Sequence, residues 1–276
     1  TNGHGDIRAL GSKSRRPKSH PNAHTEAEIT LIRNLRRRNL NIGLQDLWLK
    51  ARKRGYTRSQ PALLKLLRRL GMPTNQKTKP SPTCRRNKPY EQMSRPGERI
   101  QIDVKYVPKD CLSIEFRERY PLSRLYQYTA IDEYSRYRIL SGYLEHDTYA
   151  SSLFLCQVAS SFKALGIEVE CVQTDNGMEF TKQFIAKSEN NHSMFEVTAK
   201  RLGIRIKRIK PATPKHNGKV ERSHREDQRL LYSEIVRTGK LITDVKDFKR
   251  RLKRHQDKTN NRPMRPLGYL SPNDYL

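Results

Sequence analysis

The stretch IQIDVKYV, residues 100–107, decides how the second part of the chain is interpreted. Apolar and polar residues alternate along it, and alternation over this length is typical of a strand with one buried face. The polar positions, which share the other face, are Gln101, Asp103 and Lys105. Aspartate is depleted in strands, so Asp103 at the centre of this one suggests a role other than folding.

The residues after this strand alternate between strand and helix patterns. The predicted elements are strands over Leu125–Arg136 and Tyr137–Leu144, a helix over Asp147–Leu165, a strand over Ile167–Thr174, a helical stretch to Leu202, a strand over Ile204–Ile209 and a helix over about Asn217–Val236. The order βββαβαβα predicts an α/β fold of the ribonuclease-H-like type.

That order would bring three acids together: Asp103 in the first strand, Asp175 at the end of the fourth, and Glu221 early in the last helix. Each has a simpler interpretation, since Asp-Asn-Gly at 175–177 is a good turn and a first-turn glutamate suits the helix dipole. Together they suit phosphodiester chemistry, because two Mg²⁺ ions held by carboxylates can assist both oxygens of an in-line displacement.

Five blocks, in this order, closely resemble the DDE transposases of bacterial insertion sequences, relatives of retroviral integrases. They are IDVKYV (102–107), AIDEYSRY (130–137), TDNGMEF (174–180), PATPKHNGKVERSHR (211–225) and NNRPMRPLGYLSPNDYL (260–276). The resemblance implies that Asp103, Asp175 and Glu221 are catalytic and bind two Mg²⁺ ions, for which Mn²⁺ can substitute. Asp132 is the rival for the first position, but AIDEYSR belongs to the second strand in that family.

Two departures from the family pattern stand out. The segment between Asp175 and Glu221 has 45 residues, which is longer than usual, and the surplus is placed in the polar stretch Lys187–His192. Many members also carry Lys or Arg seven residues after the glutamate, where this chain has Gln228. Arg225 is therefore the expected contact to end DNA, with His224 beside it.

Composition points to a polyphosphate partner. The 276 residues contain 56 Lys and Arg against 28 Asp and Glu, a net charge of +28, and residues 1–99 hold 24 of the basic and 6 of the acidic side chains. Such charge favours binding to nucleic acid over a merely solubilising surface. No apolar run approaches the length of a membrane span, so a membrane protein is excluded. The four cysteines lack a CxxC pair and are expected to be reduced and structural: Cys84, Cys111, Cys156 and Cys171.

The first part of the chain predicts three short helices. One starts at a capping box of Thr25 and Glu28, a second spans Leu44–Arg54, and a third ends at Gly71. With the turn at Gly55 they resemble a helix-turn-helix module, although a plain helical bundle remains the alternative. The basic residues expected to contact DNA are Arg58, Lys65, Arg68 and Arg69 here, Arg85 and Arg86 in the linker, and Lys215, Asn217, Lys219, His224 and Arg225 near the last helix.

The predicted domains are a basic arm (1–24), a helix-turn-helix domain (25–72), a Pro-rich basic linker (73–98), a ribonuclease-H-like catalytic core (99–240) and a C-terminal helix and tail (241–276). The resemblance implies a further helix-turn-helix unit before Thr1. The helix at 245–255 carries six basic residues, which suit either a solvated surface or a contact to DNA or another protomer.

The predicted function is that of a transposase that binds transposon-end DNA and joins it to target DNA, in the bacterial cytoplasm in association with the nucleoid. It is expected to act as a homo-oligomer, a dimer or tetramer on paired ends, with a possible ATPase helper. Two alternatives remain open: a ribonuclease-H-like nuclease that cuts without joining, and a catalytically silent DNA-binding regulator.

Overall fold

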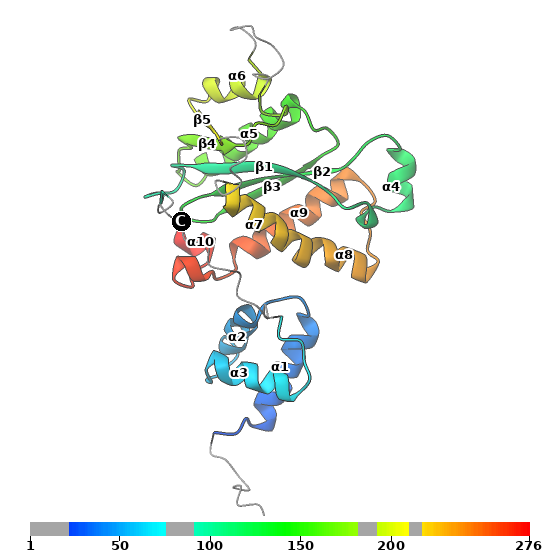
Figure 1. The fold of residues 1–276 in the computed structure, drawn as a ribbon, viewed down its shortest axis with the longest axis vertical. Coiled ribbons are helices and arrows are strands. Elements are labelled where there is room, and N and C mark those ends of the chain that lie inside the picture. The colour runs from blue at the N-terminus through cyan, green and yellow to red at the C-terminus, as the bar shows by residue number, and fades with distance from the viewer. Residues whose placement is uncertain (1–21, 76–90, 182–191, 210–216) are drawn as a thin grey trace, which may run out of the picture. The chain divides into compact units, whose positions relative to one another are not determined.

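A computed structural model describes residues 22–75, 91–181, 192–209 and 217–276 (Figure 1). The chain divides into two compact units, Thr1–Ser81 and Pro82–Leu276.

The first unit is built from three helices, α1 (Glu26–Arg38), α2 (Leu44–Arg52) and α3 (Gln60–Arg69), which confirms the predicted helical region. The capping box at the start of α1 is present, because Thr25 and Glu28 each accept a hydrogen bond from the other's backbone amide. Apolar side chains at helical spacing close the core: Ile32, Leu47, Leu63 and Leu67 are fully buried.

The connection between α2 and α3 is fixed by a turn and two polar contacts. Gly55 lies in the turn after α2 with φ +88°, a left-handed conformation that glycine adopts readily. The Trp48 indole donates to the Arg58 carbonyl at 2.8 Å, and the Arg58 guanidinium pairs with Glu28 at 2.7 Å. The start of α3 is therefore tied to both earlier helices.

The second unit is a five-stranded mixed sheet with helices on both faces (Figure 1). The strands are β1 (Ile100–Tyr106), β2 (Tyr126–Asp132), β3 (Arg138–Tyr143), β4 (Cys171–Thr174) and β5 (Arg205–Arg208), in the spatial order β3-β2-β1-β4-β5. The helices are α4 (Ile114–Arg119), α5 (Thr148–Lys163), α6 (Met194–Arg201), α7 (Gly218–Asp227), α8 (Ser233–Thr238), α9 (Val245–Asn260) and α10 (Pro272–Tyr275). The β1–β2 and β2–β3 pairs are antiparallel, whereas β1–β4 and β4–β5 are parallel, so the predicted α/β class is confirmed.

The two faces of the sheet carry separate cores. Ile100 and Ile102 of β1 pack with Phe154 of α5 and Phe195 of α6 on one face. On the other face the core includes Leu140 of β3, Tyr232 of the π-helical segment before α8, Ile235 of α8, and Phe248 and Leu252 of α9. Ile100 and Ile102 thus lie on the buried apolar face that the sequence pattern of β1 predicts.

Helix α9 covers β3, which is an edge strand of the sheet. Side-chain oxygens of Gln256 and Asn260 accept hydrogen bonds from the backbone amides of Leu140 and Arg138, at 2.9 and 3.0 Å. These contacts pair backbone groups that an edge strand otherwise leaves open. The opposite side of α9 exposes basic residues: Lys246, Lys249, Arg250, Lys253, Arg254 and Lys258.

Three predicted elements differ in detail. The fourth strand starts at Cys171 rather than 167, because the Glu170 amide bonds to a loop carbonyl at Gly97. The long first hairpin contains the short helix α4. The last predicted helix is α7 followed by a π-helical segment, Gln228–Tyr232, and α8.

Among the described residues no helix has the length and apolar character needed to cross a membrane. The described cysteines, Cys111, Cys156 and Cys171, are free, whereas Cys84 lies outside the described residues.

Candidate active site

The polar face of β1 lies against α7 and the π-helical segment that continues it. Three contacts join the two elements, one for every second residue of the strand and every fourth residue of the helix. Two residues along a strand advance about 6.6 Å and four along an α-helix about 6.0 Å, so such contacts can repeat. They join the Val220 amide to Gln101 Oε1 (3.1 Å), His224 Nδ1 to Asp103 Oδ2 (3.5 Å) and Lys105 Nζ to Gln228 Oε1 (3.3 Å). The strand period that directs Asp103 away from the apolar core therefore directs it toward α7.

Asp103 lies among other carboxylates. Its side chain is 20% exposed, and Oδ1 accepts a hydrogen bond from the Val104 amide. Burial is the main cause that raises the pKa of Asp103 to about 7, and the negative charges of Asp175, Glu179 and Glu221 add to it against the Val104 hydrogen bond. The three acids predicted from sequence thus share one electrostatic environment.

Asp175 follows β4, the parallel neighbour of β1. Its Oδ1 accepts the Gly177 amide at 3.0 Å, and the Asn176 side chain donates to the Ile209 carbonyl at 2.9 Å, just after β5. The turn interpretation of Asp-Asn-Gly is therefore correct for the local structure. The same turn holds Asp175 near Asp103, so folding and site geometry are compatible here.

Glu179 is a fourth acid near Asp103 that the sequence interpretation did not assign. It is buried, and one carboxylate oxygen pairs with His146 Nε2 at 2.9 Å. A Cβ on Gly177 would lie 2.3 Å from this carboxylate, so a larger residue there would displace the end of the Glu179 side chain. The sequence signal for Glu179 is its position in the block TDNGMEF, where it follows the turn at Asp175 by only a few residues.

The donor chemistry fits a hard divalent cation, although a complete ligand set is not formed. Asp103, Asp175 and Glu221 offer oxygen ligands, and within the described ranges none of them pairs with Lys or Arg. In the same part of the chain, no group of three or more His, Cys, Asp or Glu side chains is arranged to hold a metal ion. The two-metal site therefore stays a prediction.

Asp132, the rival first acid, has a structural role. It is fully buried at the end of β2, where one carboxylate oxygen accepts the Gly97 amide at 3.0 Å. The other accepts both the amide and the hydroxyl of Ser135 at 2.7 Å. One oxygen thus holds the segment before β1 and the other holds the turn after β2.

The neighbouring acid, Glu133, links two of the sequence blocks. Its side chain is fully buried and pairs with Arg99 at 2.8 Å and with Lys219 at 2.6 Å. Gln101 donates to the same carboxylate at 2.9 Å, while its own oxygen accepts the Val220 amide. Burial would raise the pKa of Glu133, but the hydrogen bonds from Arg99 and Lys219 outweigh it and lower the pKa. The first turn of α7, which carries Glu221, is thereby tied to β1 and β2.

A second buried ion pair holds the end of α7. Asp227 accepts hydrogen bonds from Arg138 of β3, His255 of α9 and Gln127 of β2. The hydroxyl of Tyr232 also bonds to Gln127. Burial opposes ionisation of Asp227, but Arg138 and His255 lower its pKa overall. Both ends of α7 are therefore fixed to the sheet.

His224 lies between these anchors and faces Asp103. Burial lowers its pKa to about 3, so the ring is neutral near pH 7. Its Nε2 is buried and has no hydrogen-bond partner among the described residues. A contact from His224 to DNA would have to come from this neutral ring.

The other residues predicted to bind DNA differ in their placement. Lys65, Arg68 and Arg69 are exposed on α3, and Arg225 is exposed on α7. The remaining predicted residues are either engaged within the protein (Arg58 with Glu28 and two carbonyls, Lys219 with Glu133), buried (Asn217) or outside the described residues (Arg85, Arg86 and Lys215).

Comparison with known families gives one match. Residues 93–214 match the family model described as Integrase core domain. The matched segment contains Asp103 and Asp175 and ends before Glu221. A comparison with curated proteins finds no match.

Solved structures similar to this chain include two integrase catalytic core domains and a chain of a viral intasome. The catalytic core domain of BIV integrase is 19% identical, with a TM-score of 0.45, over 64% of this chain and 91% of that one. The HTLV-2 integrase catalytic core domain in complex with magnesium is 15% identical, with a TM-score of 0.45, over 65% and 96%. A chain of the simian T-cell lymphotropic virus intasome, in complex with PP2A regulatory subunit B56 gamma, is 19% identical, with a TM-score of 0.43, over 83% and 68%.

The second unit has the mixed sheet with flanking helices of an integrase or ribonuclease-H-like core. The family match over residues 93–214 supports DNA integration by a polynucleotidyl transferase as the activity of this unit.

Proposed function

We propose that the protein is a DNA transposase that binds the ends of a mobile element, cleaves them and joins the freed 3′-hydroxyl to target DNA. The observation that carries the proposal is the group of carboxylates around Asp103, in which Asp175, Glu179 and Glu221 contribute to its raised pKa. Asp103, Asp175 and Glu179 of this group lie in the region that matches the integrase core domain, and Glu221 follows that region.

In this proposal Asp103, Asp175 and Glu221 hold two Mg²⁺ ions, or Mn²⁺. The bound ions would activate the attacking oxygen and stabilise the leaving one. The protein's own contribution is to place the three carboxylates, with both ends of α7 held by Glu133 and Asp227. Fixed placement is important because positioning supplies much of the rate in phosphoryl transfer.

End recognition is assigned to a helix-turn-helix module formed by α2 and α3. The exposed Lys65, Arg68 and Arg69 on α3 support it, because their charges are available to DNA phosphates and bases. The segment between the two helices, residues 53–59, is longer than the three- to four-residue turn usual in such modules, at roughly twice that length.

The test begins with selection of the duplex that the protein binds most tightly from a random library. Joining of that duplex to plasmid DNA is then measured with Mg²⁺ for the wild type and for Asp103→Asn, Asp175→Asn and Glu221→Gln. Each variant should bind the duplex normally and lose joining, whereas Glu234→Gln, an exposed control on α8, should retain it.

The alternatives give different results in the same assay. A nuclease would cut the duplex without joining it, and a silent regulator would bind it without metal-dependent cleavage. Joining by any one of the triad variants at the wild-type rate would remove that residue from the site. Light scattering on the DNA complex tests the proposed dimer or tetramer, because a fully active monomer would contradict it.

A further inference from the structure

The ammonium of Lys105 is held in one place beside the acidic group. Lys105 follows Asp103 by two residues on the same face of β1. Its Nζ donates to Gln228 Oε1 at 3.3 Å and lies 4.7 Å from the centre of the Tyr232 ring. The ring itself is fixed, because Tyr232 is fully buried and its hydroxyl bonds to Gln127.

These partners are a neutral amide and an aromatic face, and within the described parts of the chain Lys105 forms no ion pair. The carboxylate of Asp227 is close by, but it already accepts hydrogen bonds from Arg138, His255 and Gln127. A half-buried ammonium without its own anion is poorly compensated, and an anionic ligand would stabilise it.

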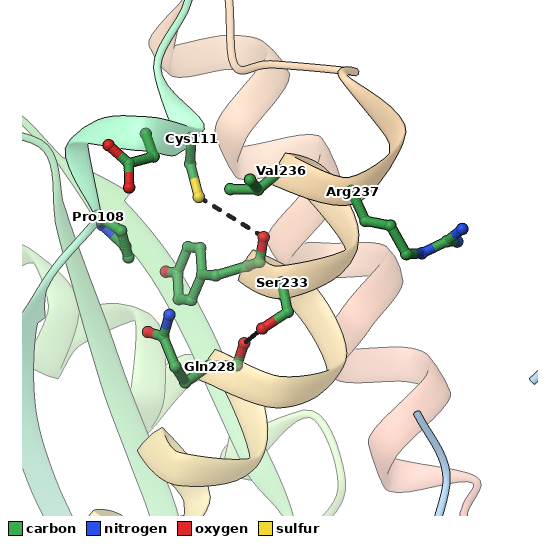
Figure 2. Close-up of a pocket in the computed structure, with 8 residues that line it drawn as sticks. Pro108, Cys111, Gln228, Ser233, Val236 and Arg237 are labelled. Carbon is green, nitrogen blue, oxygen red and sulfur yellow. Dashed lines mark hydrogen bonds between the residues drawn. The ribbon is translucent and has the colours of Figure 1, made fainter. Parts of the chain in front are cut away.

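The surroundings of Gln228 and Tyr232 leave room on one side. Both residues line a cavity of about 290 Å³ together with Cys111, Ser233 and other residues of the segment after β1 and of α8 (Figure 2). The Cys111 thiol and the Ser233 hydroxyl are turned to the backbone carbonyls of Tyr232 and Gln228 (Figure 2). Among the described residues that line the cavity, Asp110 is the one acid and Arg237 the one cation, and Lys105 lies beside the lining rather than in it.

We propose that Lys105 binds a backbone phosphate of the DNA substrate, adjacent to the phosphate that reacts at Asp103. The proposal rests on the proposed function, because it places DNA at this site. Alternate residues on a strand are about 6.6 Å apart, so Lys105 reaches past the reacting group along the direction of β1. A lysine ammonium is a compact charge that suits a single phosphate.

The first experiment transfers the positive charge of Lys105 to position 228, the residue that Lys105 contacts at 3.3 Å. Binding of the selected duplex is measured without Mg²⁺ for the wild type, Lys105→Gln and the exchange variant Lys105→Gln with Gln228→Lys. Lys105→Gln should bind roughly 10- to 100-fold more weakly, and its log–log salt slope should fall by about 0.9, as for one lost phosphate contact. The exchange variant should recover binding and joining, whereas Lys240→Gln, an exposed control, should match the wild type.

The second experiment replaces single backbone phosphates of the duplex by neutral methylphosphonates. One position next to the joined end should weaken binding by the wild type but not weaken binding by Lys105→Gln any further. The wild-type protein alone shows which phosphate next to the joined end contributes to binding, and the comparison with Lys105→Gln then assigns that phosphate to Lys105.

Unchanged affinity and salt slope in Lys105→Gln, or additive effects at every methylphosphonate, would overturn the proposal. So would an exchange variant that folds normally but fails to recover binding. Because binding is measured without Mg²⁺, loss of the Lys105 contact is distinct from failure of the transposase assignment, which the joining assay of the wild type decides.

Discussion

Glu133 holds the first turn of α7, and its charge can be removed with little change of shape by Glu133→Gln. The carboxylate is fully buried and binds Arg99, Lys219 and Gln101, whose own oxygen binds the backbone of α7. The substitution therefore leaves the buried Arg99 with Glu91 as its charged partner and faces the half-buried Lys219 with a neutral side chain. We expect both the stability of the second unit and the placement of Glu221 to suffer.

The size of the effect follows from the burial of these groups. Removing one partner of a buried ion pair costs about 3–5 kcal/mol, and the lower end applies because glutamine can still accept a hydrogen bond. With a urea dependence of about 3 kcal/mol per molar, the midpoint of the second unit should fall by about 1 M. The hydrogen bonds lower the pKa of Glu133 from its ordinary value of 4.5, so this stabilisation is present at pH 7 and is lost as the pH falls through the lowered value.

The chain offers an internal control for this measurement. Its one tryptophan, Trp48, lies in the first unit, so tryptophan fluorescence reports unfolding there, while far-ultraviolet circular dichroism reports both units. A matched variant is Glu234→Gln, whose pair with Arg237 is about half exposed and should contribute less than about 1 kcal/mol. Joining by Glu133→Gln should fall about 10- to 100-fold at low temperature, with DNA binding retained.

Three results would refute this reasoning. The first is a loss of stability below about 1 kcal/mol, equal to that of Glu234→Gln. The second is an equal shift of the Trp48 transition, since the effect should be confined to the second unit. The third is normal joining by a destabilised Glu133→Gln, which would show that the ion pairs do not position Glu221.

Further predictions concern the acidic group, the core and the DNA-binding helix. The apparent affinity for Mg²⁺, measured by calorimetry, should rise about tenfold per pH unit below about pH 7 and then level off. The reason is that the ion must displace a proton from Asp103, so Asp103→Asn should abolish this dependence. Gly142→Ala should destabilise the second unit by about 1–3 kcal/mol in urea unfolding, because a Cβ would lie 2.3 Å from the Phe248 ring. Lys65→Gln with Arg68→Gln should lower the salt slope of duplex binding by up to about 2, and an unchanged slope would exclude α3 from the interface.

Much of the fold could be predicted because its signals are local. Each of these signals can be recognised within a few residues: the alternation in β1, the capping box before α1 and the apolar spacing of the helices. The ends of elements were less predictable, because they depend on partners far away in the chain. β4 begins at Cys171, the first residue that pairs with β5, and pairing with β1 begins one residue later. No pattern within Ile167–Glu170 indicates where this pairing starts.

The candidate site shows the same limit more sharply. The sequence predicted that Asp103, Asp175 and Glu221 approach one another, because strand order determines which strand and helix ends meet. It did not predict which Lys and Arg side chains form ion pairs inside the protein. Lys219 and Glu133 are 86 residues apart, and the contact depends on α7 packing along β1.

This explains why net charge is a poor guide to individual DNA contacts. Of the basic residues behind the charge of +28, Arg99, Lys219 and Arg138 compensate buried acids at the two ends of α7. Their charge stabilises the frame of the site and is not available to a phosphate. Lys105 differs because its contacts among the described residues are a neutral amide and an aromatic ring, and no carboxylate there forms an ion pair with it. A basic residue is thus a candidate DNA contact when no carboxylate of the folded protein pairs with it. This can be judged only once its neighbours in the structure are known.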